Sequence, residues 1–286
     1  MATTSAVIGV LGGTGFYELL DDAQPAATGT PFGEPSEPPL IGKIAGRAVA
    51  FIPRHGKDHR FPPHLVPYQA NIWALHALGV RQVLAVAAVG SLREEIGVGR
   101  LVIPDQVVDR TYGRPQTYFD RVGGVFHAPF ADPYCPVGRR TVIDAARRHG
   151  WEPVETGTLV VVEGPRFSSR AESRFHAAQG WSIVGMTGQP EAALARELGL
   201  CYTAVALVTD VDAGIREGEG VTEAEVIAQF TRNVERIRTT IATAIELLPE
   251  RPECDCAQKG NPDLAAALHA ASRCGRRTGG ATETTR

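Results

Sequence analysis

The segment Val7-Ile8-Gly9-Val10-Leu11 is a short apolar run that leads without a break into Gly12-Gly13-Thr14-Gly15. Similar runs recur along the chain, and each is short, rich in β-branched residues and bounded by glycine, proline or charge. This pattern is typical of central strands that are buried on both faces of a sheet. The further predicted strands are Ala48–Ile52, Val83–Val89, Leu101–Ile103, Leu159–Val162, Ile183–Val184 and Tyr202–Val208.

Segments with a helical pattern lie between the predicted strands, and a long helix is predicted over Thr222–Leu248. Thr222 and Glu225 form a capping box at its start, and Pro249 ends the apolar repeat. The alternation of strands and helices predicts an α/β fold, a single domain with a central mixed, largely parallel twisted β-sheet flanked by helices. The other predicted helices are Tyr68–Leu78, Arg139–His149, Ser169–Gln179 and Glu191–Leu198.

The composition is that of a soluble globular protein, with 286 residues, 43% hydrophobic residues and a net charge of −3. We expect no nucleic-acid partner, no membrane span and a cytoplasmic location, because basic blocks, long apolar runs and a signal sequence are missing. The sequence contains no internal repeat or linker, so residues 1–250 are predicted to form one domain. Residues 251–286 turn polar and irregular, which predicts a partly disordered C-terminal tail.

Two polar segments that follow predicted strands suit the binding of an anion. Glycines at positions 12–15 let the backbone approach an anion, and Thr14 adds a hydroxyl donor. Arg54 supplies a planar fork for two phosphate oxygens and His55 adds a donor, although a solvated polar loop is the alternative. The glycine segment also resembles a dinucleotide fingerprint. That interpretation requires a helix and a second strand, where this chain has the proline- and glycine-rich residues 25–39.

Two turns at strand ends add further candidates. The strand that breaks into Gly90-Ser91 either offers backbone N–H groups to an anion or forms a tight turn. The turn Glu163–Glu172 contains Gly-Pro, and Ser168 or Ser169 is expected to cap the helix that follows. An aromatic residue at the tip, Phe167, suits stacking on an aromatic ligand.

Two carboxylates, Asp210 and Asp212, end the predicted strand Tyr202–Val208. They leave one face of the strand together unless the strand breaks between them. A turn or capping role is one interpretation. The other is recognition of a heterocycle, with one carboxyl kept protonated so that it can donate a hydrogen bond.

Five cysteines are present, and the sequence predicts no metal site. Cys135 and Cys201 lie in or near apolar stretches and are expected to be buried thiols. Cys254-Asp255-Cys256 and Cys274 lie near the end of the chain. A CxC pair without a second pair or a histidine cluster is too short for a zinc half-site, which leaves a local redox pair or no function.

Taken together, these segments resemble the methylthioadenosine phosphorylase branch of the trimeric purine nucleoside phosphorylases. The matching motifs occur in the same order from Ile8 to about Leu248, which is most of the chain. They are the Gly-Gly-Thr-Gly loop, Arg54-His55-Gly56, Tyr68–Leu75, Gly90–Ile96, Asp109–Thr111, Glu163–Ser173, Met186-Thr187 and Thr209–Asp212. The Cys254–Cys256 pair is also similar to the CxC endings of some microbial members, which favours a disulfide slightly.

Position by position, the resemblance implies a phosphate site, with phosphate as co-substrate and no metal or organic cofactor. The residues implied to surround phosphate are Thr14, Arg54, His55, Ala88 and Thr187. Met186 and Phe167 are implied to pack on the ribose and purine, and Ser168, Asp210 and Asp212 to recognise the base. The methylthio pocket is implied to contain Val226 and His127, the latter from the neighbouring subunit of a homotrimer, alone or paired into a hexamer.

The resemblance implies phosphorolysis of S-methyl-5'-thioadenosine to adenine and 5-methylthioribose 1-phosphate, with Asp210 as the acid that donates to the departing purine. At two places the sequence differs from the pattern of the methylthioadenosine phosphorylases, and these differences leave other activities possible. Gly185–Pro190 differs from the Asn-Met-Thr-Thr pattern of the adenosine-type enzymes and is similar to relatives that act on methylthioinosine or other 6-oxopurine nucleosides, although these usually carry Asn at the position of Asp210. Ala87 replaces a usual threonine. The alternatives are a 6-oxopurine nucleoside phosphorylase, a nucleoside hydrolase and an NAD-linked oxidoreductase.

Overall fold

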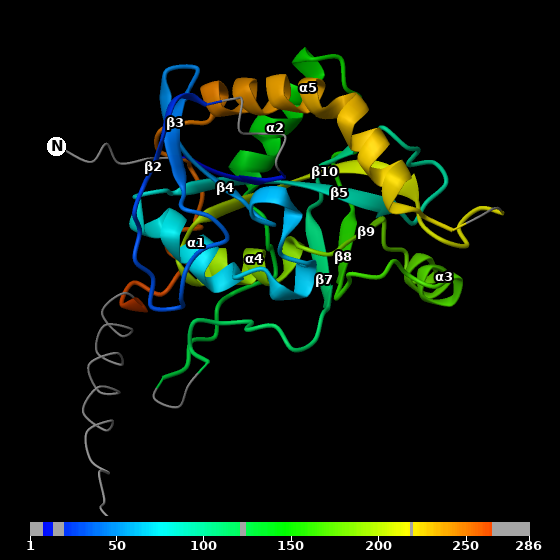
Figure 1. Cartoon of the computed structure of the whole chain (residues 1–286), viewed down its shortest axis with the longest axis horizontal. Coiled ribbons are helices and arrows are strands. Elements are labelled where there is room, and N and C mark those ends of the chain that lie inside the picture. The colour runs from blue at the N-terminus through cyan, green and yellow to red at the C-terminus, as the bar shows by residue number, and fades with distance from the viewer. Residues whose placement is uncertain (1–7, 14–19, 121–123, 218–219, 265–286) are drawn as a thin grey trace, which may run out of the picture.

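The computed structural model describes residues 8–13, 20–120, 124–217 and 220–264, which form a ten-stranded sheet with helices on both faces (Figure 1). The strands are β1 (Ile8–Gly12), β2 (Asp21–Pro25), β3 (Leu40–Ile44), β4 (Arg47–Pro53), β5 (Gln82–Ser91), β6 (Leu101–Val102), β7 (Gln106–Arg110), β8 (Thr158–Val162), β9 (Ile183–Gly185) and β10 (Cys201–Val211). The α-helices are α1 (Tyr68–Ala77), α2 (Pro136–Arg148), α3 (Arg170–Ala178), α4 (Gly188–Glu197) and α5 (Glu223–Leu247). Two short 3-10 turns, Lys57–His59 and Pro63–Leu65, lie between β4 and α1.

The sheet is mixed and parallel at its centre, as the sequence predicts. Its strand order is β2-β3-β4-β1-β5-β9-β8-β7, with β10 paired to β5 and β6 paired to β10. The pairs of β1 with β4 and β5, of β5 with β10, and of β8 with β7 and β9 are parallel. Antiparallel pairs join β2 to β3, β3 to β4, β5 to β9 and β6 to β10. The predicted α/β fold class is therefore confirmed.

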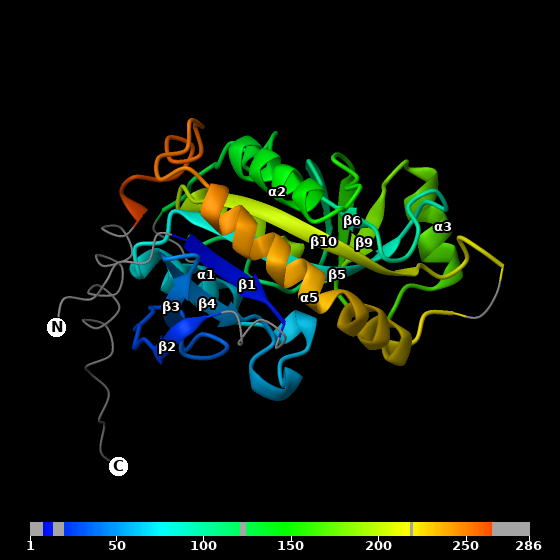
Figure 2. The same ribbon diagram turned by 90° about the horizontal axis from the view of Figure 1, so that it is seen from above.

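The central strands are buried on both faces because alternate side chains point into two helical layers. On one face, Ile8 and Leu84 pack with residues of α2 and α5. On the other face, Leu11 and Ala85 pack with residues of α1 and α4. Figure 2 shows α2 and α5 lying side by side across β10. This arrangement leaves the carboxyl ends of the parallel strands as the place where polar residues gather.

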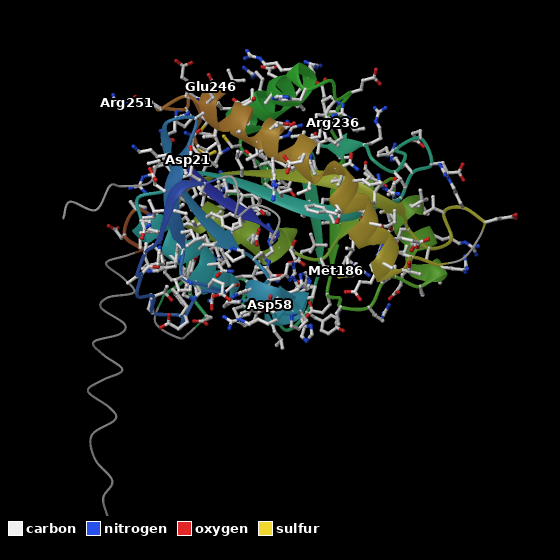
Figure 3. All side chains as sticks on the ribbon, turned by 45° about the horizontal axis from the view of Figure 1, so that its top comes forward. Asp21, Asp58, Met186, Arg236, Glu246 and Arg251 are labelled. Carbon is white, nitrogen blue, oxygen red and sulfur yellow. The ribbon has the colours of Figure 1, made fainter. Side chains whose placement is uncertain are left out.

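The helix α5 follows the amphipathic pattern predicted for Thr222–Leu248. Thr222 and Glu225 form the capping box, and Ile237 and Ile241 are buried against the body. Glu246, labelled in Figure 3, lies on the exposed side of the same helix. None of the helices in the described ranges combines the length and the apolar character that a membrane span requires.

Candidate active site

The candidate site is built where β1, β4, β5 and β10 end at one edge of the sheet. In the parallel register, Gly12 lies opposite Pro53 at the ends of β1 and β4. Asp210 of β10 lies opposite Gly90 of β5. The residues that follow these strands are therefore held close together by backbone pairing alone. Thr14, implied to bind phosphate, lies outside the described residues.

Arg54 is a buried cation that is held by a buried carboxylate. Its Nε donates to Glu191 Oε1 at 2.5 Å and its Nη2 donates to Glu191 Oε2 at 3.0 Å. Its Nη1 donates to the carbonyl of Val86 at 2.8 Å, and Tyr202 donates to Glu191 at 2.8 Å. Burial alone lowers the pKa of Arg54, but the carboxylate of Glu191 outweighs it and keeps the arginine charged. Further N–H groups of Nη1 and Nη2 can then serve an anion, in a fixed orientation.

A pocket beside Arg54 brings three of the predicted site residues together. Met186, labelled in Figure 3, and Thr187 line it together with Arg54. Thr187 is the N-cap residue of α4, but its side chain makes no capping hydrogen bond. Its hydroxyl is therefore free of a capping role and can donate to an anion. The backbone of α4 is not helical at Gln189, so the regular part of the helix begins after that residue. Ala87 lines the same pocket, and the half-buried Ala88 follows it on β5.

His55 is neutral and has a defined tautomer. Burial lowers the pKa of His55 to about 4, and the positive charge of Arg54 acts in the same direction. Its Nδ1 lies 2.9 Å from the carbonyl oxygen of Phe61, so Nδ1 carries the proton and Nε2 keeps its lone pair. The ring stacks on His59 at a centroid distance of 4.2 Å. His55 thus offers an acceptor, which suits the O–H of a protonated phosphate, in place of the donor predicted from the sequence.

Asp210 and Asp212 have different surroundings, created by a β-bulge. The register of β10 on β5 shifts between Val208 and Asp210, with Thr209 as the extra residue. Thr209 donates to Asp210 Oδ2 at 2.9 Å. Burial, the strongest influence, and the neighbouring Asp212 raise the pKa of Asp210 to about 6. A carboxyl of this kind holds a proton more readily than an ordinary aspartate, and it can act as a donor.

Asp212 accepts a hydrogen bond from a residue of α3 and so connects the site to that helix. It is 4% exposed, and it accepts a hydrogen bond from Ser173 at 2.6 Å. Its backbone N–H donates to the carbonyl of Ser91 at 2.9 Å. Ser173 belongs to α3, so the segment Glu163–Ser173 and the segment Thr209–Asp212 meet at this hydrogen bond.

The turn before α3 places Phe167 and Ser168 half-buried at the start of that helix. Ser169, rather than Ser168, is the N-cap residue, and it forms a capping box with Glu172. Of the two serines between which the sequence could not decide, Ser169 therefore has the structural role. The implied part of Ser168 in base recognition stays a prediction.

Val226 and His127 are the two residues implied to form the methylthio pocket, and the residue next to Val226, Glu225, is close enough to act on the pKa of Asp210. Val226 is half-buried in the first turn of α5, and His127 is exposed in the segment that precedes α2. Within the described residues of one chain, no hydrogen bond or ion pair joins His127 to Arg54 or Asp210. Their roles in the methylthio pocket stay predictions.

Two site residues were missed by the sequence analysis, Glu191 and Arg114. Glu191 lies in the first turn of α4, where a single acidic residue in a helical segment gives no sign that it is buried. Arg114 is 5% exposed and donates through Nη1 to the carbonyls of Met186 at 2.8 Å and Gln189 at 2.7 Å. It also donates through Nε to Glu163 at 3.0 Å. Arg114 thus fixes the backbone of Met186 against the strand end at Glu163.

An α/β sheet with a buried arginine and a carboxyl of raised pKa at one strand edge has the groups that an enzyme of group transfer requires. The family model of the phosphorylase superfamily matches residues 7–246, and the chain belongs to this superfamily. The chain is 55% identical to the purine nucleoside phosphorylase of Streptomyces coelicolor, over 92% of this chain and 98% of that one. It is 52% identical to the S-methyl-5'-thioadenosine phosphorylase of Mycolicibacterium smegmatis, over 87% of this chain and 93% of that one.

A solved structure shows the same architecture. The methylthioadenosine phosphorylase of Schistosoma mansoni in complex with adenine superposes with a TM-score of 0.81 at 35% identity. The match covers 93% of this chain and 98% of that one. The enzyme class expected from the sequence, a pentosyltransferase of the purine nucleoside phosphorylase type, is therefore confirmed.

Proposed function

We propose that the protein cleaves S-methyl-5'-thioadenosine with phosphate to give adenine and 5-methylthioribose 1-phosphate. The observation that carries the proposal is Asp210, a carboxyl at the same strand edge as Arg54, whose pKa is raised to about 6 so that it takes up and gives back a proton more readily than an ordinary aspartate. The relatives named as methylthioadenosine phosphorylases support this substrate.

The reaction breaks the bond between the sugar C1' and the purine N9, and a phosphate oxygen forms the new bond to C1'. Positive charge develops on the sugar and negative charge on the departing purine. Phosphate held by Arg54 and Thr187 stabilises the sugar cation and then attacks it. Asp210 donates its proton toward N7 of the purine, so that adenine leaves as a neutral base. These steps use no metal and no organic cofactor.

The protein residues proposed to contact the purine end and the methylthio end of the substrate support methylthioadenosine as the nucleoside. Asp210 as donor and Asp212 as acceptor match N7 and the 6-amino group of adenine. Val226 is apolar, and an apolar pocket suits a methylthio group better than a 5'-hydroxyl. In this proposal His127 completes the pocket from a neighbouring subunit of a homotrimer, which acts in the cytoplasm.

A second candidate is a 6-oxopurine nucleoside or methylthioinosine phosphorylase. Gly185 and Gly188 flank Met186-Thr187, in place of the Asn and Thr of the adenosine-type pattern. The Streptomyces coelicolor relative, at 55% identity, is named a purine nucleoside phosphorylase. Both observations favour a broader range of purines.

One assay distinguishes the two candidate phosphorylase activities from each other and from the hydrolase alternative. The full chain is incubated with methylthioadenosine, methylthioinosine, adenosine and inosine, each with and without phosphate, and the free base is measured by chromatography. We expect the highest kcat/KM with methylthioadenosine and release of adenine only with phosphate. Preference for inosine or methylthioinosine supports the second candidate, and release of base without phosphate indicates a hydrolase.

Gly90→Ala is predicted to lower activity by displacing Asp210. A Cβ atom at position 90 would lie 2.8 Å from Asp210 Oδ1 and 3.3 Å from Asp212 Cβ. Since a shift of about 1 Å at a catalytic group costs up to about 100-fold, we expect kcat/KM to fall by about 10- to 100-fold. Gly97→Ala is the matched control, because nothing lies within 4 Å of the added atom. Equal activity of the two variants would show that Asp210 tolerates displacement.

Arg114→Gln is predicted to weaken nucleoside binding, because Arg114 holds the carbonyls of Met186 and Gln189. Loss of charge-assisted hydrogen bonds of about 1.5–3 kcal/mol predicts a rise of about 10-fold or more in KM for the nucleoside. The KM for phosphate is expected to change less, and Arg114→Lys to recover part of the loss. Initial rates with each substrate varied in turn test this. A parallel rise in both KM values would indicate general loss of structure.

A further inference from the structure

Four cysteines from three distant segments meet at the end of the sheet opposite the candidate active site. Cys135 is the N-cap residue of α2, Cys201 begins β10, and Cys254 and Cys256 follow α5. Their four sulfur atoms all lie within 4.8 Å of one another. Cys135, Cys201 and Cys256 are buried and Cys254 is partly exposed. The fold thus supplies, from Cys135 and Cys201, the second pair that the CxC motif lacks in the sequence.

The spacing of these sulfurs fits a tetrahedral metal site. Four thiolates at about 2.3 Å from one Zn²⁺ ion have sulfur–sulfur separations of about 3.8 Å. Cys135 Sγ lies 3.8 Å from Cys254 Sγ, and Cys201 Sγ lies 3.4 Å from Cys254 Sγ. Four sulfur donors fill all the positions of a tetrahedron, which is the closed arrangement of structural zinc sites. We propose that Cys135, Cys201, Cys254 and Cys256 bind one structural Zn²⁺ ion.

A buried arginine near the cysteine cluster can offset part of the net negative charge of a zinc tetrathiolate. Arg196 is 3% exposed, and its Nη2 donates at 2.6 Å to the carbonyl of Asp132, three residues before Cys135. Within the described part of the chain, its Nε and Nη1 are buried without a hydrogen-bond partner. A cation left unpaired in the interior is costly, and the net negative charge of a zinc tetrathiolate offsets that cost.

The proposed ion holds the segment after α5 on the body of the protein. Asn261 donates from its backbone to the carbonyl of Glu197 at 2.8 Å, and Leu264 is buried. The described part of the predicted tail, residues 251–264, is therefore attached to the body at these points. Cys201 and Asp210 lie nine residues apart on one strand, or about 30 Å at the usual rise of a strand. The ion is thus expected to affect stability and to leave the chemistry unchanged.

The test is the metal content of the full chain, expressed in zinc-supplemented medium without an affinity tag and purified without chelators. Native mass spectrometry under non-reducing conditions is expected to show one zinc ion per chain, with four protons displaced from the thiols. Elemental analysis should confirm about one equivalent of zinc. Cys254→Ser and Cys256→Ser should each lose most of the zinc and melt at a lower temperature, with kcat/KM at 25 °C within about twofold of the original chain. Cys274→Ser is the matched control and should retain zinc, because four ligands already complete the site.

Two results overturn the proposal. One is a metal-free chain whose mass is lower by the hydrogen atoms of one or two disulfides, which would assign these cysteines to redox pairs. The other is full zinc content in Cys254→Ser and Cys256→Ser. If a serine variant fails to fold, the mass of the original chain still decides between zinc and disulfides.

Discussion

Asp210→Asn is expected to lower kcat/KM for methylthioadenosine by about 100-fold or more, which is the usual loss when a general acid is removed. An amide keeps the size of the side chain but holds no acidic proton for the departing purine. Its NH₂ group can still donate to an acceptor, so 6-oxopurine nucleosides should lose much less. The measurement is kcat/KM for methylthioadenosine and methylthioinosine with the original chain and the variant. An unchanged ratio between the two substrates would remove Asp210 from base recognition.

The pH dependence provides an independent readout of the same residue. The pKa of Asp210 is raised to about 6, mainly by burial, so the donating form predominates below that pH and is lost as the pH rises through it. The profile of kcat/KM, which reports the free enzyme, should therefore decline through an inflection near pH 6. The inflection should be absent from Asp210→Asn, because an amide does not titrate in this range.

Thr209→Val is the matched control for that inflection. Thr209 donates to Asp210 at 2.9 Å, and this hydrogen bond lowers the pKa of the carboxyl. Valine keeps the shape of the side chain but removes the hydroxyl, so the pKa of Asp210 should rise further. The inflection should therefore move to higher pH while most activity remains. An inflection that does not move in Thr209→Val would assign the pH dependence to another group.

The central strands could be predicted from the sequence because burial on both faces requires uninterrupted apolar runs. The strand β2 at the edge of the sheet could not be predicted in this way, because it lacks an apolar run. Asp21–Pro25 forms β2 although four of its five residues are exposed, because pairing with β3 places it there. Helix boundaries differ for local reasons. The predicted helix Arg139–His149 begins at Pro136, because Cys135 caps the N–H of Gly138.

Some residues of the candidate site could likewise be predicted from the sequence, and others could not. Arg54, His55, Asp210 and Asp212 were predicted because they follow strands that run parallel and end at one edge. Glu191 and Arg114 were not, since Glu191 acts on Arg54, 137 residues away, and Arg114 acts on Met186, 72 residues away. The cysteine cluster could not be predicted either, because its members come from segments that are far apart in the sequence. Cys254 and Cys256 show half of it in the sequence, and only the fold brings Cys135 and Cys201 beside them.

Arg54→Met is expected to abolish most phosphorolysis and also to destabilise the protein. Without the guanidinium, the carboxylate of Glu191, which is fully buried, has lost its counter-charge. Breaking a buried ion pair by removing one partner costs about 3–5 kcal/mol, which thermal or urea unfolding would reveal. The loss of activity alone therefore does not show whether Arg54 binds phosphate or only supports the fold.

The double variant Arg54→Met/Glu191→Gln separates these two roles. Replacing both charges removes the unpaired carboxylate, so most of the lost stability should return, because a neutral pair in this place avoids the cost of burying a lone charge. Phosphorolysis should stay at least about 100-fold below that of the original chain, because the cation that orients phosphate is still absent. Phosphate should also raise the melting temperature of the original chain but not that of the double variant. Recovery of both stability and activity in the double variant would show that Arg54 serves the fold and that phosphate is bound elsewhere.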